Sequence, residues 1–219
     1  MSRAVIVLHG IAMNRMWMAG MARHLRGKHY TVYDISYPSR EKTFDQLVDD
    51  HITPVVKEAF EKSGQPVDFV VHSMGGLLVR YYAQKYGAAK IGRVVMIGTP
   101  NRGSEVADFL RRFPPFEWYF GVAGQTLGTT ADDIHAKLPP VPFECGIIAG
   151  RNHYFHFPTS YIVDIPRPND GLVSIDSTKV DGMKDHVVIF GDHSLMVWMP
   201  GVWKLASQFL GTGSFKDAA

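Results

Sequence analysis

A serine, an aspartate and a histidine stand along this chain in an order that suits nucleophilic catalysis. They are Ser73 in the run HSMGG, Asp170 in the run NDG, and His193 after a Gly-Asp pair. A serine hydroxyl attacks well only when a base takes its proton, and a histidine oriented by a carboxylate is the usual base. The three residue types therefore predict a catalytic triad of Ser73, Asp170 and His193.

The stretch around Ser73 predicts the local structure that such a nucleophile needs. Val67–Val71 is an apolar run that suits one buried strand, and Leu77 and Tyr81 recur at helical spacing. A serine on a sharp turn between a strand and a helix is a nucleophile elbow, usually written Gly-x-Ser-x-Gly. Val71 replaces the first glycine here. A serine before a helix is also a common N-cap, so the motif alone leaves both interpretations open.

The acid and the base each have alternatives. An Asn-Asp-Gly run is a strong turn signal, so Asp170 is also explained as a loop residue, and His193 as a helix cap. Competing candidates are Asp164 and Asp176 for the acid and His186 for the base. His186 opens a predicted strand, whereas Asp170 and His193 follow strands, as Ser73 does. Because the carboxyl ends of parallel strands meet at one edge of a sheet, we expect the triad to assemble there.

An oxyanion hole is expected beside Ser73. Two backbone N–H groups must point at the negative charge that develops on the substrate oxygen. One should come from Met74, the residue after the nucleophile, and the other from Ile11, in the loop after the first predicted strand. The run His9-Gly10-Ile11 is otherwise explained as an ordinary turn between a strand and a helix.

Apolar runs alternate with helical patterns along most of the chain. Strands are predicted at Ala4–Leu8, Thr31–Ser36, Val67–Val71, Val94–Ile97, Phe143–Ala149 and Val187–Phe190. Helices are predicted at Arg15–Leu25, Phe44–Lys62 with a kink at Pro54, Ser73–Tyr86, and from beyond His193 to about Leu210. The alternation predicts an α/β fold with a mostly parallel six-stranded sheet and helices on both faces. The polar tail Gly211–Ala219 is expected to fray.

The alternation fails between Asn101 and Val141, a segment rich in Phe, Pro and Gly. We interpret it as an insertion, at about residues 101–142, in a single domain of residues 1–219. Its aromatic side chains either fill a small satellite core or overhang Ser73 as a lid and line an acyl pocket. The pocket residues expected in the second case are Met13, Trp17, Phe109, Phe116 and Trp118, and the expected hinges are Gly121, Gly124 and Gly128.

Four stretches carry a resemblance to a known family: LHGI at Leu8–Ile11, VDFVVHSMGG at Val67–Gly76, IGTPNRGSEVADF at Ile97–Phe109 and NDGLVS at Asn169–Ser174. With them the chain resembles the α/β-hydrolases of the bacterial lipase and esterase group. It is similar to small Bacillus lipases, which also lack the first glycine of the elbow. The resemblance implies a serine ester hydrolase that forms an acyl-enzyme on Ser73. The apolar pocket expected in the 101–142 segment would favour short-to-medium acyl chains over acetate.

Other activities remain open at this point. The same triad serves thioesterases and amidases, and a hydrolase fold also occurs in binding proteins without catalysis. The resemblance does not extend over Arg111–Val141, and small Bacillus lipases lack a lid. Larger bacterial lipases bind calcium near the catalytic histidine, but that ligand set is not matched here. From the resemblance to lipases and esterases we expect a small-molecule or lipid ester as substrate. If the 101–142 segment is a lid, we also expect it to make transient contact with a lipid surface.

The composition of the chain bears on its partners, its cellular compartment and its cofactors. Of 219 residues, 46% are hydrophobic and 20% charged, and the net charge is +2, so nothing indicates a nucleic-acid partner. The single cysteine, Cys145, allows no intrachain disulfide, which suits a reducing compartment, and its apolar setting suits an inert thiol. No run has signal-peptide or transmembrane length, so we expect a cytoplasmic protein. His153 and His156 lack a convincing third ligand, so no metal or other cofactor is expected.

Overall fold

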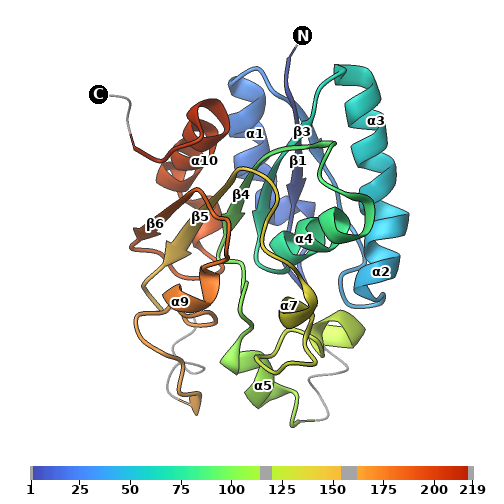
Figure 1. The fold of residues 1–219 in the computed structure, drawn as a ribbon. Helices are drawn as coiled ribbons and strands as arrows, with labels where there is room; N and C mark the ends of the chain where they lie inside the picture. Colours follow the sequence, from blue (N-terminus) through green and yellow to red (C-terminus); the bar gives the residue numbers. More distant parts are fainter. Residues whose placement is uncertain (1, 114–119, 154–161, 217–219) are drawn as a thin grey trace.

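A six-stranded parallel sheet forms the centre of the molecule (Figure 1). The computed structural model describes residues 2–113, 120–153 and 162–216. The strands are β1 (Ala4–Leu8), β2 (Thr31–Asp34), β3 (Val67–His72), β4 (Ile91–Ile97), β5 (Cys145–Gly150) and β6 (Asp185–Ile189). They lie in the order β2-β1-β3-β4-β5-β6, and every neighbouring pair is parallel. The predicted fold class is therefore confirmed.

Helices cover both faces of this sheet. The helical segments of the chain include η1 (Arg15–Met18), α1 (Ala19–Gly27), α2 (Phe44–Leu47), η2 (Val48–Ile52), α3 (Thr53–Ser63), α4 (Met74–Tyr86), α5 (Glu105–Leu110), α7 (Ile134–Lys137), α9 (Ile175–Thr178), η3 (Met196–Trp198) and α10 (Pro200–Thr212). In β1, Ile6 and Leu8 pack against α2, α3 and α4, whereas Val5 and Val7 pack against α1 and α10. Successive side chains of a strand point to opposite faces, so both apolar faces are buried.

The long helix predicted at Phe44–Lys62 is divided. It begins at Thr43, which caps α2 through a capping box with Gln46, and changes to a π-helical turn at η2. Pro54 stands in the first turn of α3. Proline has no N–H to donate to the preceding turn, so the irregular turn falls directly before it.

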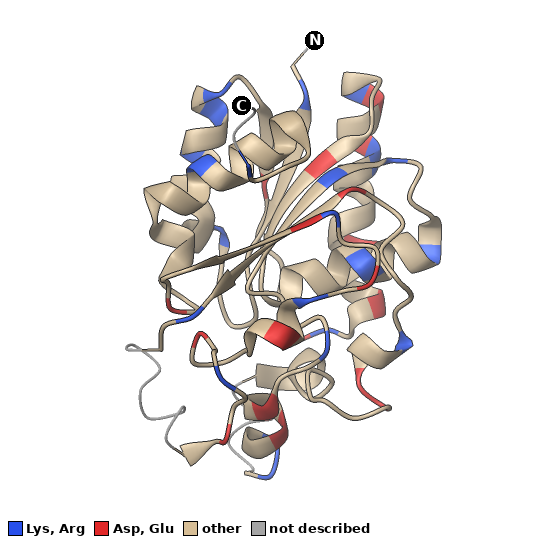
Figure 2. Cartoon of the chain, turned by 60° about the vertical axis from the view of Figure 1, so that its left-hand side comes forward, with Lys and Arg blue, Asp and Glu red and all other residues tan. Residues whose placement is uncertain are grey.

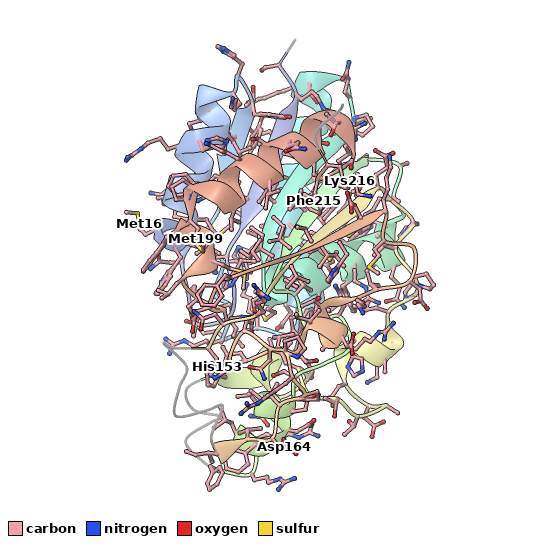
Figure 3. All side chains as sticks on the ribbon, turned by 90° about the vertical axis from the view of Figure 1, so that its left-hand side faces the viewer. Met16, His153, Asp164, Met199, Phe215 and Lys216 are labelled. Atoms are coloured by element: carbon pink, nitrogen blue, oxygen red, sulfur yellow. The ribbon has the colours of Figure 1, made fainter. Side chains whose placement is uncertain are left out.

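The C-terminal tail is more ordered than predicted. Helix α10 ends at Thr212, and Phe215 packs against Phe209 with ring centroids 5.0 Å apart (Figure 3). The Phe215 N–H also donates to Asp185 at the start of β6, over 2.7 Å. The prediction that the tail frays from Gly211 is therefore wrong up to residue 216, because one aromatic side chain anchors it to the sheet.

The segments that follow the strands gather at one end of the molecule. Figure 1 shows α5, α7 and α9 at that end, opposite the N-terminus.

Among the described residues, the longest helices have 13 residues, which is short of the roughly 20 needed to span a bilayer. Basic and acidic residues are interspersed over the helices and loops in view (Figure 2).

Candidate active site

Ser73 occupies a strained turn between β3 and α4. Its backbone has φ 51° and ψ −124°, a region that non-glycine residues rarely adopt. The turn is fixed because the Ser73 N–H donates to Ile97 O over 2.9 Å and Gly76 N–H donates to Ser73 O over 3.0 Å. Within the described residues, the Ser73 side chain makes no capping hydrogen bond to α4. The structure thus has the geometry of an elbow, and the N-cap interpretation does not fit it.

Two glycines allow the first loop to approach this turn. A Cβ on Gly10 would lie 3.1 Å from the Ser73 Cβ, and one on Gly75 would lie 3.0 Å from the His9 backbone oxygen. Real Cβ atoms are seldom that close to their neighbours, so larger residues would push the loop after β1 away from Ser73. Because Gly75 has no Cβ, the start of α4 can pack directly against the end of β1.

The loop after β1 is stiffened by His9. The His9 ring stacks on Tyr37 with centroids 4.1 Å apart, and its Nδ1 lies 2.8 Å from Gly10 O. The Tyr37 N–H donates to His9 Nε2, and the Tyr37 hydroxyl donates to His9 O. Burial lowers the pKa of His9, so the ring is neutral, with Nδ1 as donor and Nε2 as acceptor.

Backbone N–H groups of Ile11 and Met74 are available beside Ser73. Ile11 lines the same cavity as Ser73, and Met74 is the first residue of α4. Within the described part of the chain, neither N–H donates to another protein atom. The N-terminal end of α4 also carries the positive end of the helix dipole. These features suit the oxyanion hole predicted at Ile11 and Met74.

Asp170 and His193 form a buried pair. The His193 Nδ1 lies 2.8 Å from Asp170 Oδ2, and the His193 N–H donates to Asp170 O over 3.0 Å. The other carboxylate oxygen of Asp170 accepts the N–H groups of Leu172 and Val173, over 3.1 and 2.8 Å. Asp170 therefore shapes its own turn and also orients the imidazole, so the two interpretations of this residue are compatible.

The competing candidates lie elsewhere. Asp164 is exposed at the outer end of the molecule near α5 (Figure 3). Asp176 is exposed and pairs with Lys179, and His186 lies at the start of β6, 3.0 Å from the Thr178 hydroxyl. None of the three is at the His193 ring in the described structure.

Ser73 and His193 line one small apolar cavity of about 90 Å³. Its other lining residues are Ile11, Pro100, Ser104, Val106, Ala107, Leu110, Phe120, Leu127, Leu172 and Val173. Most of them come from the segment between β4 and β5, whereas Leu172 and Val173 follow Asp170 after Gly171. From the sequence we expect Ile11 and the aromatic residues of the 101–142 segment, which include Phe120, near Ser73. Sequence reasoning missed the other lining positions, although the apolar pair in NDGLVS was a usable signal.

The predicted pocket residues are placed differently. Trp17 stacks on Trp198 with ring centroids 4.7 Å apart, and Phe109 packs beside Val106 and Ile165. Neither they nor Met13 line the cavity that Ser73 shares with His193. Phe116 and Trp118 lie outside the described residues.

The glycines predicted as hinges are tightly packed. A Cβ on Gly121 would lie 1.6 Å from Arg40 O, and one on Gly128 would lie 2.3 Å from Asp108 Oδ1. A Cβ on Gly124 would meet the Phe120 side chain at 2.6 Å. Glycine is needed at these positions for close approach, so the hinge interpretation does not fit them.

The described residues include the alternative nucleophile, Cys145, and one of the two candidate metal ligands, His153. Burial raises the pKa of the Cys145 thiol to about 12, which makes it a poor nucleophile. Within the described ranges, His, Cys, Asp and Glu side chains form no cluster of three or more that could hold a metal ion. His156 lies outside those ranges.

Comparison with known proteins places this geometry in a family. The model of the alpha/beta hydrolase fold matches residues 3–138, which is more than half of the chain. The chain belongs to the alpha/beta-hydrolase family. The match includes Ser73 and ends before Asp170 and His193, so those two assignments rest on the structure of this hydrolase itself.

Solved structures agree with this fold. The hydrolase superposes on the mature lipase of Bacillus licheniformis with a TM-score of 0.78, over 95% of this chain and 92% of that one, at 17% identity. The monoacylglycerol lipase of Paleococcus ferrophilus gives 0.63 over 96% and 95%, at 15% identity. The lipase of Staphylococcus hyicus gives 0.63 over 89% and 88%, also at 15% identity. Such identities show a shared fold.

Proposed function

We propose that this hydrolase cleaves carboxylic esters through an acyl-enzyme on Ser73. The carrying observation is that Ser73, on its strained turn, and His193, bound to Asp170, line the same cavity. A nucleophile and a base in one apolar cavity, together with a carboxylate that orients the base from behind, are the parts that acyl transfer requires. Several structural neighbours are named as lipases, which supports ester rather than amide chemistry.

The mechanism follows from which atoms hold protons. Asp170 accepts the His193 Nδ1–H, which leaves Nε2 deprotonated and able to act as base toward the Ser73 hydroxyl. Ser73 Oγ attacks the ester carbonyl, and the negative oxygen is stabilised by the Ile11 and Met74 N–H groups. His193 then protonates the leaving alcohol, and water deacylates Ser73 by the same route in reverse.

The cavity supports a short acyl group. Its volume of about 90 Å³ is well below the roughly 300–1,000 Å³ of typical ligand pockets, and its walls are mainly aliphatic. An acetyl group would leave part of these walls uncovered, whereas a long chain exceeds the space. The proposed substrates are therefore esters of small apolar acids, with the alcohol lying outside the cavity.

A series of p-nitrophenyl esters tests the proposed function. From acetyl to butanoyl, two added methylenes should raise kcat/KM by up to roughly 15-fold, since each buried methylene contributes about 0.8 kcal/mol. Beyond hexanoyl, kcat/KM should fall because the chain no longer fits. An acyl-CoA and an anilide belong in the same panel. Faster turnover of either one would reassign the bond cleaved, and no turnover of any substrate would reject the proposal.

Matched phenylalanine variants test whether this cavity sets chain length. Phe120→Ala removes a wall, so the ratio of octanoyl to butanoyl kcat/KM should rise about tenfold. Phe113, 49% exposed and in ring contact with Phe109, does not line the cavity, so Phe113→Ala should leave the ratio unchanged. Equal profiles for the two variants would place the acyl group elsewhere.

Gly98 gives a test of the acid–base geometry. Its φ is +58°, and a Cβ there would lie 3.2 Å from His193 Nδ1 and 3.3 Å from Asp170 Oδ2. Gly98→Ala should lower kcat by on the order of 10-fold, because the pair must shift by a few tenths of an ångström and a misplacement of about 1 Å costs about 10²-fold. Gly87 is the control, because its φ is +78° and a Cβ there would meet no atom within 4 Å.

Both alanine variants should lose roughly 1–2 kcal/mol of unfolding free energy from backbone strain, measured by urea denaturation. Only Gly98→Ala should lose turnover, because only its methyl group meets the pair. Equal loss of turnover in Gly87→Ala would mean that strain alone, and not contact with Asp170 and His193, explains the effect.

A further inference from the structure

His72 contacts the backbone of the proposed general base. Its side chain is fully buried, and its Nε2 lies 2.9 Å from the His193 backbone oxygen. The His193 N–H, on its other side, donates to Asp170 O over 3.0 Å. Both backbone polar groups of His193 are therefore held, one by the acid residue and one by the neighbour of the nucleophile.

The contact between His72 and His193 joins two parts of the sheet that are not neighbours. Ser73 follows the central strand β3, whereas His193 follows the edge strand β6, and β4 and β5 lie between them. Small errors in the placement of each strand accumulate between the two side chains that must exchange a proton. The His72 contact bypasses the intervening strands, because it joins the last residue of β3 directly to His193.

We propose that His72 is a positioning residue that fixes the His193 loop relative to Ser73. The inference rests on the proposed function, in which His193 takes the Ser73 proton. A carbonyl oxygen only accepts, so His72 must carry a proton on Nε2 to make this bond. The required property is a donor at that distance from the backbone, and a buried ring of the right shape is not enough.

Replacing His72 with side chains of different length and donor capacity distinguishes the need for a donor from the need for a buried side chain of similar size. A glutamine amide nitrogen lies about as far from the backbone as the histidine Nε2 and also donates. An asparagine amide is shorter, and a leucine is of similar bulk to histidine without any donor. A buried carbonyl that loses a donor also loses the stabilisation of that hydrogen bond. We therefore expect kcat per active site to be highest in the wild type, lower in His72→Gln, and lowest in His72→Asn and His72→Leu.

The experiment measures turnover of p-nitrophenyl butanoate per active site, with sites counted by stoichiometric fluorophosphonate labelling. Counting sites removes the contribution of misfolded protein. His72→Leu should lower kcat by on the order of 10- to 100-fold with KM within twofold, since misplaced groups slow the chemical step and leave binding intact. His72→Gln should recover kcat to within about fivefold of wild type. His24→Leu is the control, because His24 makes a similar bond, 3.0 Å to the Ser207 hydroxyl, on α1.

Each result decides the inference. Equal kcat per site in His72→Leu and wild type, or equal loss in His72→Gln and His72→Leu, would overturn it. If His72→Leu does not fold, the comparison of His72→Gln with His72→Asn decides, and equal values would overturn it. Failure of the proposed function is recognised separately, as wild-type protein that is neither labelled at Ser73 nor active on any ester.

Discussion

Replacement of Ser73 by alanine is expected to abolish ester hydrolysis. The hydroxyl is the only group removed, and without it no acyl-enzyme forms. Loss of a triad member costs on the order of 10⁴-fold or more in kcat, because the remaining groups act only with the nucleophile present. Turnover of p-nitrophenyl butanoate and labelling by a fluorophosphonate should both disappear.

Stability should change little in this variant. Alanine occupies the same backbone with a smaller side chain, and the Ser73 side chain makes no capping bond whose loss would destabilise α4. Ser63→Ala is the control, because Ser63 ends α3 and bonds only to nearby backbone groups. Undiminished turnover in pure Ser73→Ala protein would refute the mechanism.

Replacement of Asp170 by asparagine is expected to have a similarly large effect on kcat. Two N–H groups, of Leu172 and Val173, donate to Oδ1, so the asparagine carbonyl oxygen should take that position. Its NH₂ group then faces His193 Nδ1 and donates to it. This reverses the tautomer, because Nδ1 must now accept and Nε2 carries the proton. An imidazole in that form cannot take the proton of Ser73.

The expected loss is about 10⁴-fold in kcat, with KM nearly unchanged, since the interaction matters when the imidazole becomes charged. Asp164→Asn is the matched control, because that carboxylate is exposed and away from His193. Steady-state kinetics of the two variants decide between the carboxylates. A damaging Asp164→Asn beside a mild Asp170→Asn would show that the acid is misassigned.

The sequence predicted those parts of the fold that depend on the pattern of apolar residues within one segment. The strand at Ala4–Leu8 is a continuous apolar run, and its bounds agree with β1. Helix α4 shows its spacing in Leu77, Leu78 and Tyr81, and begins at Met74. The order of Ser73, Asp170 and His193 suggested one shared site because a parallel sheet brings the ends of its strands together, and in the structure Asp170 does contact His193.

Contacts between distant segments were not readable in this way. The partner of Trp17 is Trp198, which lies 181 residues further along the chain. The residues next to Gly121 give no indication that it packs against Arg40 O. The local sequence therefore suggests a hinge, whereas the glycine is required because the packing leaves no room for a Cβ. The cavity walls were missed for the same reason, since aliphatic residues such as Leu127 and Val173 become a pocket only by their arrangement. Local sequence indicates the reactive atoms, and the long-range packing determines what surrounds them.

Among the strands that the structure describes, β6 pairs with β5 alone, and its residues are mostly half-buried, whereas every residue of β3 is buried. Local opening of a protein needs less free energy at such margins than at the centre of a sheet. The proposed nucleophile thus follows a fully buried central strand, whereas the proposed base follows a mostly half-buried strand at the edge of the sheet. We therefore expect partial opening of the β6 edge to lower the population of active molecules. Asp185 and Phe215, which fasten the tail across that margin, contribute to the lifetime of the active state although both lie at the other end of the strand.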